Sequence, residues 1–440
     1  MRIVQRVAGA VQGLLTRWAQ VAADDVNLIQ RERKFSAMTL ARTVILTLLQ
    51  RPSASWNDFA RMAGTLGVDV TANGVKGRFQ EKLIAFLRAL LVRMVAQRLD
   101  APPLPAPLLA RFAGVFVGDS TTLALPDEWT EEFPGCGGAA GTGQSALKIQ
   151  VRLNVATREI DCFEWTPGRD CDVTSSLQDA PTPRGALVIH DLGYFDVGVL
   201  AARSARGIFW ISRIQTSTKV WTTDGERLEL LSVLRGLKRQ AVWDQPILLG
   251  AQHRLPCRLL AIRCPPEVAH RRRQKLKEQF RRQGRPLSQE RLAWCDWFVL
   301  ITNLPADQLT WREAAVLYRS RWQIELLFKL WKSHGLIARH PACTAVQCLA
   351  LLTGKLLAVL LQHWLLLGSE LSLSASLTKA THALRHAVHS LATALKRQRS
   401  LLEVLEDLAF PLKHATVDSR RRHPSWFQLI QDPELLAWNR

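Results

Sequence analysis

The spacing of apolar residues changes at about residue 112, and this change is the strongest limit on what the chain can fold into. Before it, apolar residues recur every three or four positions, as in LARTVILTLLQ and KLIAFLRALLVRMVAQRL, which is the pattern of amphipathic helices. After it, short apolar runs such as RFAGVFVGDS are typical of strands. DAPPLPAPLL, residues 100–109, separates the two regions, and its four prolines predict a linker.

The region after residue 112 predicts a mixed α/β sheet. LKIQVRLNVA and EIDCFEWTPG predict two antiparallel strands that meet at Thr157 and Arg158. GALVIH then predicts a buried strand, DVGVLAARSA a helix, and RGIFWISRI a further strand. Three strands followed by a strand, a helix and a strand fit a mixed sheet that delivers polar residues at its strand ends.

Residues 214–302 break this pattern and predict a β-rich domain inserted into the sheet domain. Their middle, residues 270–291, contains nine Lys or Arg and two Glu, which gives a net charge of +7. Helix resumes at Trp311 and is expected to continue past Lys332, and the Leu-rich tail is helical again. We therefore expect a helical region (1–100), a linker (101–110), a mixed-sheet domain in two parts (111–213 and 303–340), the insertion (214–302), and a second helical region (341–440).

The bulk composition favours a polyanionic partner. The 440 residues carry 58 Lys and Arg against 38 Asp and Glu, a formal charge of +20, so phosphate contacts would supply much of the binding energy. A basic but otherwise ordinary enzyme is the alternative. No pair among the eight cysteines has CxxC spacing, which indicates reduced and mostly buried thiols. The apolar stretch LLTGKLLAVLLQHWLLLG contains Lys355, Gln362 and His363, so we expect a buried or partner-facing helix and no membrane span.

Three carboxylates stand out by their positions. Asp119 is expected to end the first apolar strand, Asp191 follows the later strand GALVIH, and Glu325 lies in the helix that starts at Trp311. Divalent cations such as Mg2+ prefer oxygen ligands, and two such ions about 4 Å apart can activate an attacking oxygen and stabilise a leaving one. Acids from two neighbouring strands and a covering helix suit such a site.

The same helix carries a polar stripe. Tyr318, Arg321, Glu325 and Lys332 are three, four and seven residues apart, so they lie within roughly 60° of one another at 100° per residue. Glu325 would face the metal, Arg321 and Lys332 would hold phosphates, and Tyr318 would orient or stack. A solvated helix face with i,i+4 ion pairing is the alternative.

These residues resemble a known family. GDSTTLALP, VIHDLGYFD and YRSRWQIELLFKLWK are similar to the three signature blocks of bacterial insertion-sequence DDE transposases, and the last block matches the subgroup with the Tyr-x2-Arg-x3-Glu-x6-Lys signature. The resemblance implies that residues 111–213 and 303–340 form an RNase H-like catalytic domain with a β-rich insertion (214–302). It also implies that the helical residues 1–100 bind the DNA end and that the helical residues 341–440 serve in dimerisation or DNA contact. It also implies two Mg2+ or Mn2+ ions at Asp119, Asp191 and Glu325, and cut-and-paste chemistry through a DNA hairpin.

The resemblance also suggests contacts with DNA. Trp297 would stack on a base flipped out of the hairpin, Trp294 could serve instead, and core packing is the alternative for both. In the basic segment, a contact with the DNA backbone is expected for Arg271, Arg272, Arg273 and Lys275, with a solvated charged helix as the alternative.

Other polar residues near the blocks have no clear assignment. His190 is either a group that supports the site or a core histidine, and Leu192 stands where relatives often carry a basic residue. Turn or cap roles are expected for the remaining nearby acids, Asp127, Asp170, Asp172, Asp196 and Glu313.

The resemblance therefore implies a metal-dependent DNA transposase. Its partners would be double-stranded DNA, as terminal inverted repeats and as target, and a second copy of the chain in the synaptic complex. The expected location is the bacterial cytoplasm, in association with the nucleoid. The alternatives are an RNase H-like nuclease without strand transfer and a domesticated, non-catalytic DNA-binding protein.

Overall fold

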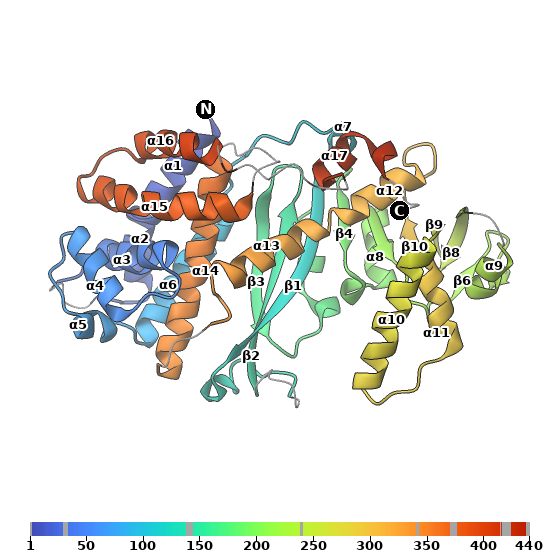
Figure 1. The fold of residues 1–440 in the computed structure, drawn as a ribbon, viewed down its shortest axis with the longest axis horizontal. Helices are drawn as coiled ribbons and strands as arrows, with labels where there is room; N and C mark the ends of the chain where they lie inside the picture. Colours follow the sequence, from blue (N-terminus) through green and yellow to red (C-terminus); the bar gives the residue numbers. More distant parts are fainter. Residues whose placement is uncertain are drawn as a thin grey trace.

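A ten-stranded mixed sheet runs from the middle to one end of the computed structural model, and a helical body lies at the other end (Figure 1). The structure describes residues 2–29, 34–137, 144–237, 241–339, 343–369, 376–413, 415 and 424–436. The strands are β1 (Val115–Leu125), β2 (Ser145–Asn154), β3 (Glu159–Pro167), β4 (Leu187–His190), β5 (Phe209–Arg213), β6 (Val220–Trp221), β7 (Arg227–Leu228), β8 (Val242–Leu249), β9 (Leu255–Arg263) and β10 (Trp297–Thr302).

The order of the strands is β3-β2-β1-β4-β5-β10-β9-β8-β6-β7. Strands β1, β2 and β3 pair antiparallel, whereas β4 runs parallel to both β1 and β5. These five strands have the topology of an RNase H-like sheet. Strand β10 pairs antiparallel with β5, so the strands of the inserted region extend the same sheet. The predicted mixed α/β fold with helical flanks is confirmed.

Helices cover the sheet and form its flanks. Those before or within the sheet region are α1 (Ile3–Leu14), α2 (Arg17–Asp25), α3 (Ala37–Gln50), α4 (Trp56–Thr65), α5 (Ala72–Lys76), α6 (Glu81–Ala96), α7 (Pro107–Ala110), α8 (Val197–Ala205), α9 (Leu230–Gly236), α10 (Pro266–Arg282) and α11 (Gln289–Ala293). Those after the sheet are α12 (Trp311–Arg319), α13 (Trp322–Ser333), α14 (Ala345–Gly368), α15 (Leu377–Lys396), α16 (Leu401–Lys413) and α17 (Trp426–Gln431).

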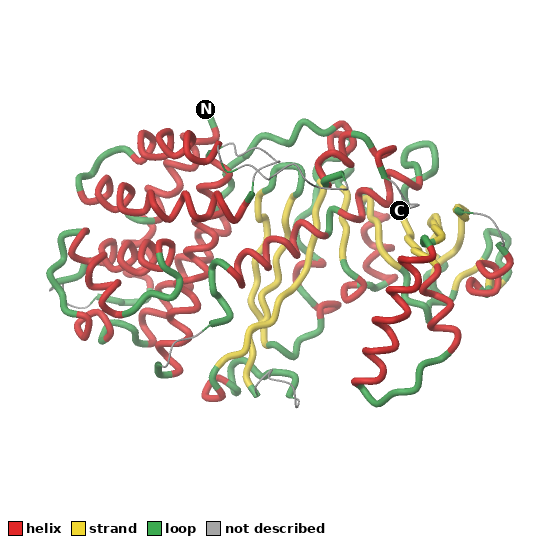
Figure 2. The backbone as a smooth tube through the Cα atoms, in the orientation of Figure 1, coloured by secondary structure: helices red, strands yellow, loops and turns green. Residues whose placement is uncertain are grey.

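Helices α1–α6 and α14–α16, from the two ends of the chain, pack into one helical body (Figures 1 and 2). Helix α14 packs against α1, α3 and α6, and it approaches α3 so closely that a Cβ on Gly354 would lie 2.7 Å from Leu48 Cδ1. This helix is long and apolar enough to cross a membrane, but 83% of its most apolar window is buried inside the protein. Of the two roles expected for the stretch, the buried one is confirmed, and burial accounts for its apolar composition.

One buried lysine connects this body to the helix before it. Lys355, in the middle of α14, is only 3% exposed, and its Nζ donates to the backbone oxygens of Leu336 (3.0 Å) and Arg339 (2.6 Å). Burial lowers the pKa of Lys355 to about 8. The ammonium group therefore fixes the segment that follows α13 to the helical body, because a buried ammonium group needs acceptors for its N–H groups.

The single helix expected from Trp311 past Lys332 is wrong in one respect, because it is interrupted between Arg319 and Trp322. Both Ser320 and Arg321 keep right-handed helical dihedrals, but the amide of Arg321 bonds to Tyr318 O, three residues back. Trp426 Nε1 donates to the buried Ser320 Oγ at 3.0 Å. This tertiary contact lies at the tightened turn, and a helical period cannot reveal it.

Candidate active site

Two of the predicted acids emerge side by side from neighbouring strands. The parallel pairing of β1 with β4 ends at Gly118 opposite His190. Asp119 and Asp191 are the next residues of these two neighbouring segments. Asp191 directly follows β4, as expected. Asp119 does not end its strand, which was the expectation, because β1 continues to Leu125 in register with β2. The place where β1 loses its β4 neighbour, and not the end of β1, positions this carboxylate.

The third acid, Glu325, comes from α13, which packs across β1 and β2 (Figure 1). Arg321, one turn before it, has an ion pair with each acid: Nη2 lies 2.5 Å from Glu325 Oε1, Nη1 lies 3.4 Å from Asp119 Oδ2, and Nε lies 3.6 Å from Asp191 Oδ1. All three predicted carboxylates therefore surround a single guanidinium group, which is the arrangement that a cation site requires.

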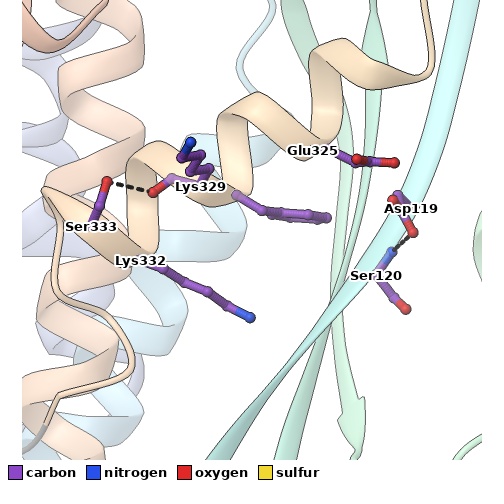
Figure 3. A pocket seen from close by; sticks show the side chains of 7 residues that line it. Asp119, Ser120, Glu325, Lys329, Lys332 and Ser333 are labelled. Atoms are coloured by element: carbon purple, nitrogen blue, oxygen red, sulfur yellow. Dashed lines mark hydrogen bonds between the residues drawn. The ribbon is translucent and has the colours of Figure 1, made fainter. Parts of the chain in front are cut away.

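The carboxylates open onto a cavity of about 510 Å³. Figure 3 shows Glu325 and Asp119 pointing toward each other between α13 and β1, with Lys332 extending toward the strand side. The cavity is lined by Asp119, Ser120, Glu325, Phe328, Lys329, Lys332 and Ser333. Acids at one end and lysines at the other suit a ligand with phosphate groups held beside metal ions.

The environment of Asp119 is poor in compensating charge. Burial raises the pKa of Asp119, the Ser120 amide and Arg321 lower it, and the nearby Asp191 and Glu325 raise it, so that the pKa lies at about 6. The Ser120 amide donates to Asp119 Oδ1 at 2.8 Å. A carboxylate that one arginine and one amide do not fully compensate would gain from a closer cation.

The donor set fits divalent metal ions. Three carboxylates are the hard oxygen ligands that such ions prefer, and Arg321 stands in for a cation among them. Within the described ranges no three acidic, histidine or cysteine side chains are drawn together tightly enough to hold an ion as they stand. Binding an ion there would require the Arg321 guanidinium to turn away.

Tyr318 and Lys332, the other members of the polar stripe, have different surroundings. Tyr318 is 7% exposed, its ring packs 5.7 Å from that of Phe298, and its hydroxyl has no hydrogen-bond partner among the described residues. Burial raises the pKa of Tyr318 to about 12. Lys332 is exposed and lines the cavity. Only Lys332 is therefore open to a ligand without rearrangement.

Residues 110–361 match the family model described as the transposase DDE domain, which covers more than half of the chain. The chain belongs to this family. It is thus a DDE transposase, as predicted, in a family that uses divalent metal ions.

Curated relatives agree with this assignment. The chain is 26% identical over 360 residues to the transposase of insertion sequence IS231F from Bacillus thuringiensis subsp. israelensis, a match that covers 77% of this chain and 75% of the relative. It is 28% identical over 210 residues to the putative transposase InsL of IS186A from Escherichia coli K12, covering 44% and 54%. A cryo-EM structure of the piggyBac transposase synaptic complex with hairpin DNA aligns at a TM-score of 0.46 and 8% identity, over 94% of this chain and 84% of that one.

The inserted region of the transposase holds a second cavity, of about 370 Å³. Trp297 and Trp294 both line it, but Trp297 is only 4% exposed and has the Arg263 guanidinium 4.6 Å from its ring, whereas Trp294 is half-buried. The cavity is also lined by the basic side chains Arg213, Arg272, Lys275 and Arg291. It therefore combines indole surfaces with cations.

The four basic residues singled out on α10 divide into two pairs. Arg272 Nη1 donates to the Trp297 backbone oxygen at 2.9 Å, and Arg273 pairs with Asp296, so both are tied to the inserted region itself. Arg271 and Lys275 are exposed. The exposed pair is free to reach a polyanion, while the other pair fixes the helix to its support.

The polar residues without a clear assignment take several roles. His190 is 5% exposed, and its Nδ1 lies 3.4 Å from Arg203 Nη2. Burial and the neighbouring arginines hold the pKa of His190 well below its usual range, so the ring is neutral. Asp196 caps α8, as expected of a turn acid.

Asp172 does not fit the turn role expected for it. Its carboxylate accepts from Ser120 Oγ at 2.9 Å and pairs with Lys148 Nζ at 3.1 Å. Sequence reasoning missed this link, because the two partners lie 52 and 24 residues away.

The raised pKa of Asp119 predicts a pH-dependent stability. The pKa is about 6 in the folded chain against an ordinary 3.8, so the stabilising contribution of the protonated form is lost as the pH rises through about 6. Without divalent metal, Asp119→Asn should raise the free energy of unfolding above about pH 7, by at most about 3 kcal/mol, and the effect should shrink as the pH falls and vanish below the ordinary pKa of 3.8. Urea unfolding followed by tryptophan fluorescence measures this, with Asp170→Asn as the control. A variant no more stable than the wild type near pH 8 would contradict the assignment.

Proposed function

We propose that this transposase cuts and rejoins DNA by a cut-and-paste route, with two Mg2+ or Mn2+ ions held by Asp119, Asp191 and Glu325. The observation that carries the proposal is the meeting of all three carboxylates around one cationic group. When bound, the ions would supply an activated attacking oxygen and a stabilised leaving oxygen. The match of the third sequence block to the Tyr-x2-Arg-x3-Glu-x6-Lys signature further supports this subgroup.

The reaction would proceed in four steps on DNA. Water cleaves one strand at the transposon end and leaves a 3′-hydroxyl. This hydroxyl then attacks a phosphodiester of the opposite strand, expels the 3′-oxygen of the flanking DNA and closes a hairpin. A second water opens the hairpin, and the same 3′-hydroxyl finally attacks the target DNA. Lys332 would hold a phosphate of the end, and Arg321 would do so once it leaves the carboxylates. Tyr318 would orient Arg321 and the DNA end from its buried position.

The remaining surfaces suggest where DNA and a second copy of the chain bind. The exposed Arg271 and Lys275 on α10 would contact the DNA backbone. The N-terminal part of the helical body, residues 3–96, would bind the terminal inverted repeat. Joining two ends requires a homodimer in the synaptic complex. Because α14 is buried, a dimer contact from the described helices of the C-terminal region would use α15, α16 or α17. The enzyme would act on nucleoid DNA in the cytoplasm.

The ligand assignment predicts a specific loss of chemistry. Asp119→Asn, Asp191→Asn and Glu325→Gln should each abolish cleavage of labelled end DNA in Mg2+ or Mn2+, because each removes a carboxylate ligand, and each should retain the gel shift of that DNA. Glu128→Gln, at an exposed acid outside the cavity, should behave as the wild type.

The products separate the proposal from its rivals. Joined target product from the wild type supports a transposase, whereas cleavage without joining would show a nuclease. A wild type with no activity whose gel shift survives in every variant would show a non-catalytic DNA-binding protein. Full cleavage by Glu325→Gln would remove that residue from the ligand set.

The second cavity is proposed to take an unpaired base, with Trp294 as the stacking residue, because Trp297 is already enclosed. Trp294→Ala should weaken binding of hairpin DNA by about 1–3 kcal/mol, the usual contribution of one stacked base, and destabilise the fold less than Trp297→Ala, because Trp294 is half-buried at the edge of the core. Trp297→Ala should instead lower the free energy of unfolding by about 3–5 kcal/mol. A 2-aminopurine base at the hairpin tip reports stacking by fluorescence. If the 2-aminopurine fluorescence is still quenched in Trp294→Ala but is no longer quenched in a stably folded Trp297→Phe, then Trp297 and not Trp294 is the stacking residue.

A further inference from the structure

The two strand-borne acids lie just beyond the last pair of the parallel ladder. Backbone pairing fixes β1 relative to β4 only as far as Gly118 and His190. After that point β1 stays paired with β2 alone, while the chain after Asp191 turns into a 3₁₀ turn, η4 (Leu192–Tyr194). The spacing of Asp119 and Asp191 therefore needs another source of rigidity.

The carboxylate of Asp172 lies between these two segments. Its Oδ1 accepts a hydrogen bond from Ser120 Oγ at 2.9 Å, one residue after Asp119. Its Oδ2 lies against Gly193, two residues after Asp191, where a Cβ would come within 3.1 Å of that oxygen. The 3₁₀ turn that carries it, η2 (Asp172–Thr174), packs against η4. One side chain thus touches both acid-bearing segments.

Lys148 on β2 holds this carboxylate in place. Its Nζ lies 3.1 Å from Asp172 Oδ1 and also donates to the backbone oxygen of Asp170. The Lys148 and Asp172 side chains are 12% and 25% exposed, so water competes only weakly for the pair. Because the ammonium group neutralises it, Asp172 adds no uncompensated fourth negative charge beside the three acids.

The contacts of Asp172 differ from those of an ordinary turn aspartate. A capping aspartate accepts hydrogen bonds from backbone amides of its own turn. Among the described residues, the Asp172 side chain instead bonds to Ser120 and Lys148, which belong to two strands of the sheet. The side chain is therefore used to join distant segments.

We propose that Asp172, held by Lys148, is a positioning residue that fixes Asp119 relative to Asp191 and so sets the affinity of the site for divalent ions. This inference rests on the proposed function, because it takes the two acids as metal ligands. Hydrogen-bonded groups that orient metal ligands typically contribute about 10–100-fold to metal affinity. Asp172 does not touch the ion; it acts through Ser120 and through the turn after Asp191.

The test is Mn2+ binding to the full-length protein, measured from free Mn2+ by electron paramagnetic resonance. Asp172→Ala should bind Mn2+ about 10-fold more weakly or worse. Asp172→Asn loses the same charge but keeps an oxygen that can accept from Ser120 and Lys148. Its affinity for Mn2+ should therefore stay within about 3-fold of the wild-type affinity, a much smaller change than the loss expected for Asp172→Ala. Asp170→Asn is the matched control, because its side chain makes no hydrogen bond or ion pair within the described part of the chain.

A double variant tests the route of the effect. If Asp172 acts largely through Ser120, then Ser120→Ala should weaken Mn2+ binding and Asp172→Ala with Ser120→Ala should be no worse than Asp172→Ala alone. Effects that multiply in the double variant would overturn the proposal. So would equal losses in Asp172→Asn and Asp172→Ala, because charge and not position would then be the cause.

Two further measurements keep the outcomes distinct. Urea unfolding measures the folded fraction of each variant. If Mn2+ binding weakens only in proportion to a fall in that fraction, Asp172 is merely structural and the inference is overturned. Glu325→Gln serves as the reference for the ligand set. If it loses Mn2+ binding while Asp172→Ala retains it, only the inference about Asp172 fails. If Glu325→Gln binds Mn2+ like the wild type, the proposed function itself fails.

Discussion

The rest of the site is organised around the ion pairs of Arg321 with Asp119, Asp191 and Glu325. Three carboxylates repel one another when they are brought together in a partly buried place, and only a cation of suitable size and position makes the arrangement stable. Arg321 provides that cation here, one helical turn from Glu325 on the same helix. A guanidinium can also bind phosphate in a bidentate manner, so the group that pairs with the three carboxylates is suited to move onto DNA when metal ions replace it.

The fold fixes the helix that carries Arg321 and Glu325 at both of its ends. Before α13, the Ser320 hydroxyl accepts a hydrogen bond from Trp426, and after it Lys355 binds the backbone oxygens of Leu336 and Arg339. The second anchor lies in α14, within the helical body built from both ends of the chain. Glu325 therefore meets the two strand-borne acids only when the helical body and the sheet are both assembled.

Much of this fold could be predicted from the sequence, because strand and helix periods are local properties. The antiparallel pair of β2 and β3, strand β4 with Asp191 directly after it, and the inserted strands all follow such patterns. The features that were missed depend on partners far along the chain. Nothing local shows that β1 continues past Asp119, that the helix tightens at Ser320, or that Asp172 bonds to a hydroxyl 52 residues away. The burial of Trp297 is likewise a tertiary property, set by packing within the insertion.

The central claim is that the three carboxylates form one divalent-metal site once Arg321 leaves them. The most direct measurement is a crystal structure with Mn2+ and an inverted-repeat DNA end, with the ions located by anomalous scattering. We expect two Mn2+ peaks contacted by Asp119, Asp191 and Glu325, with the Arg321 guanidinium on a DNA phosphate. Mn2+ peaks away from these carboxylates, or Arg321 still bridging all three acids beside bound DNA, would contradict the account.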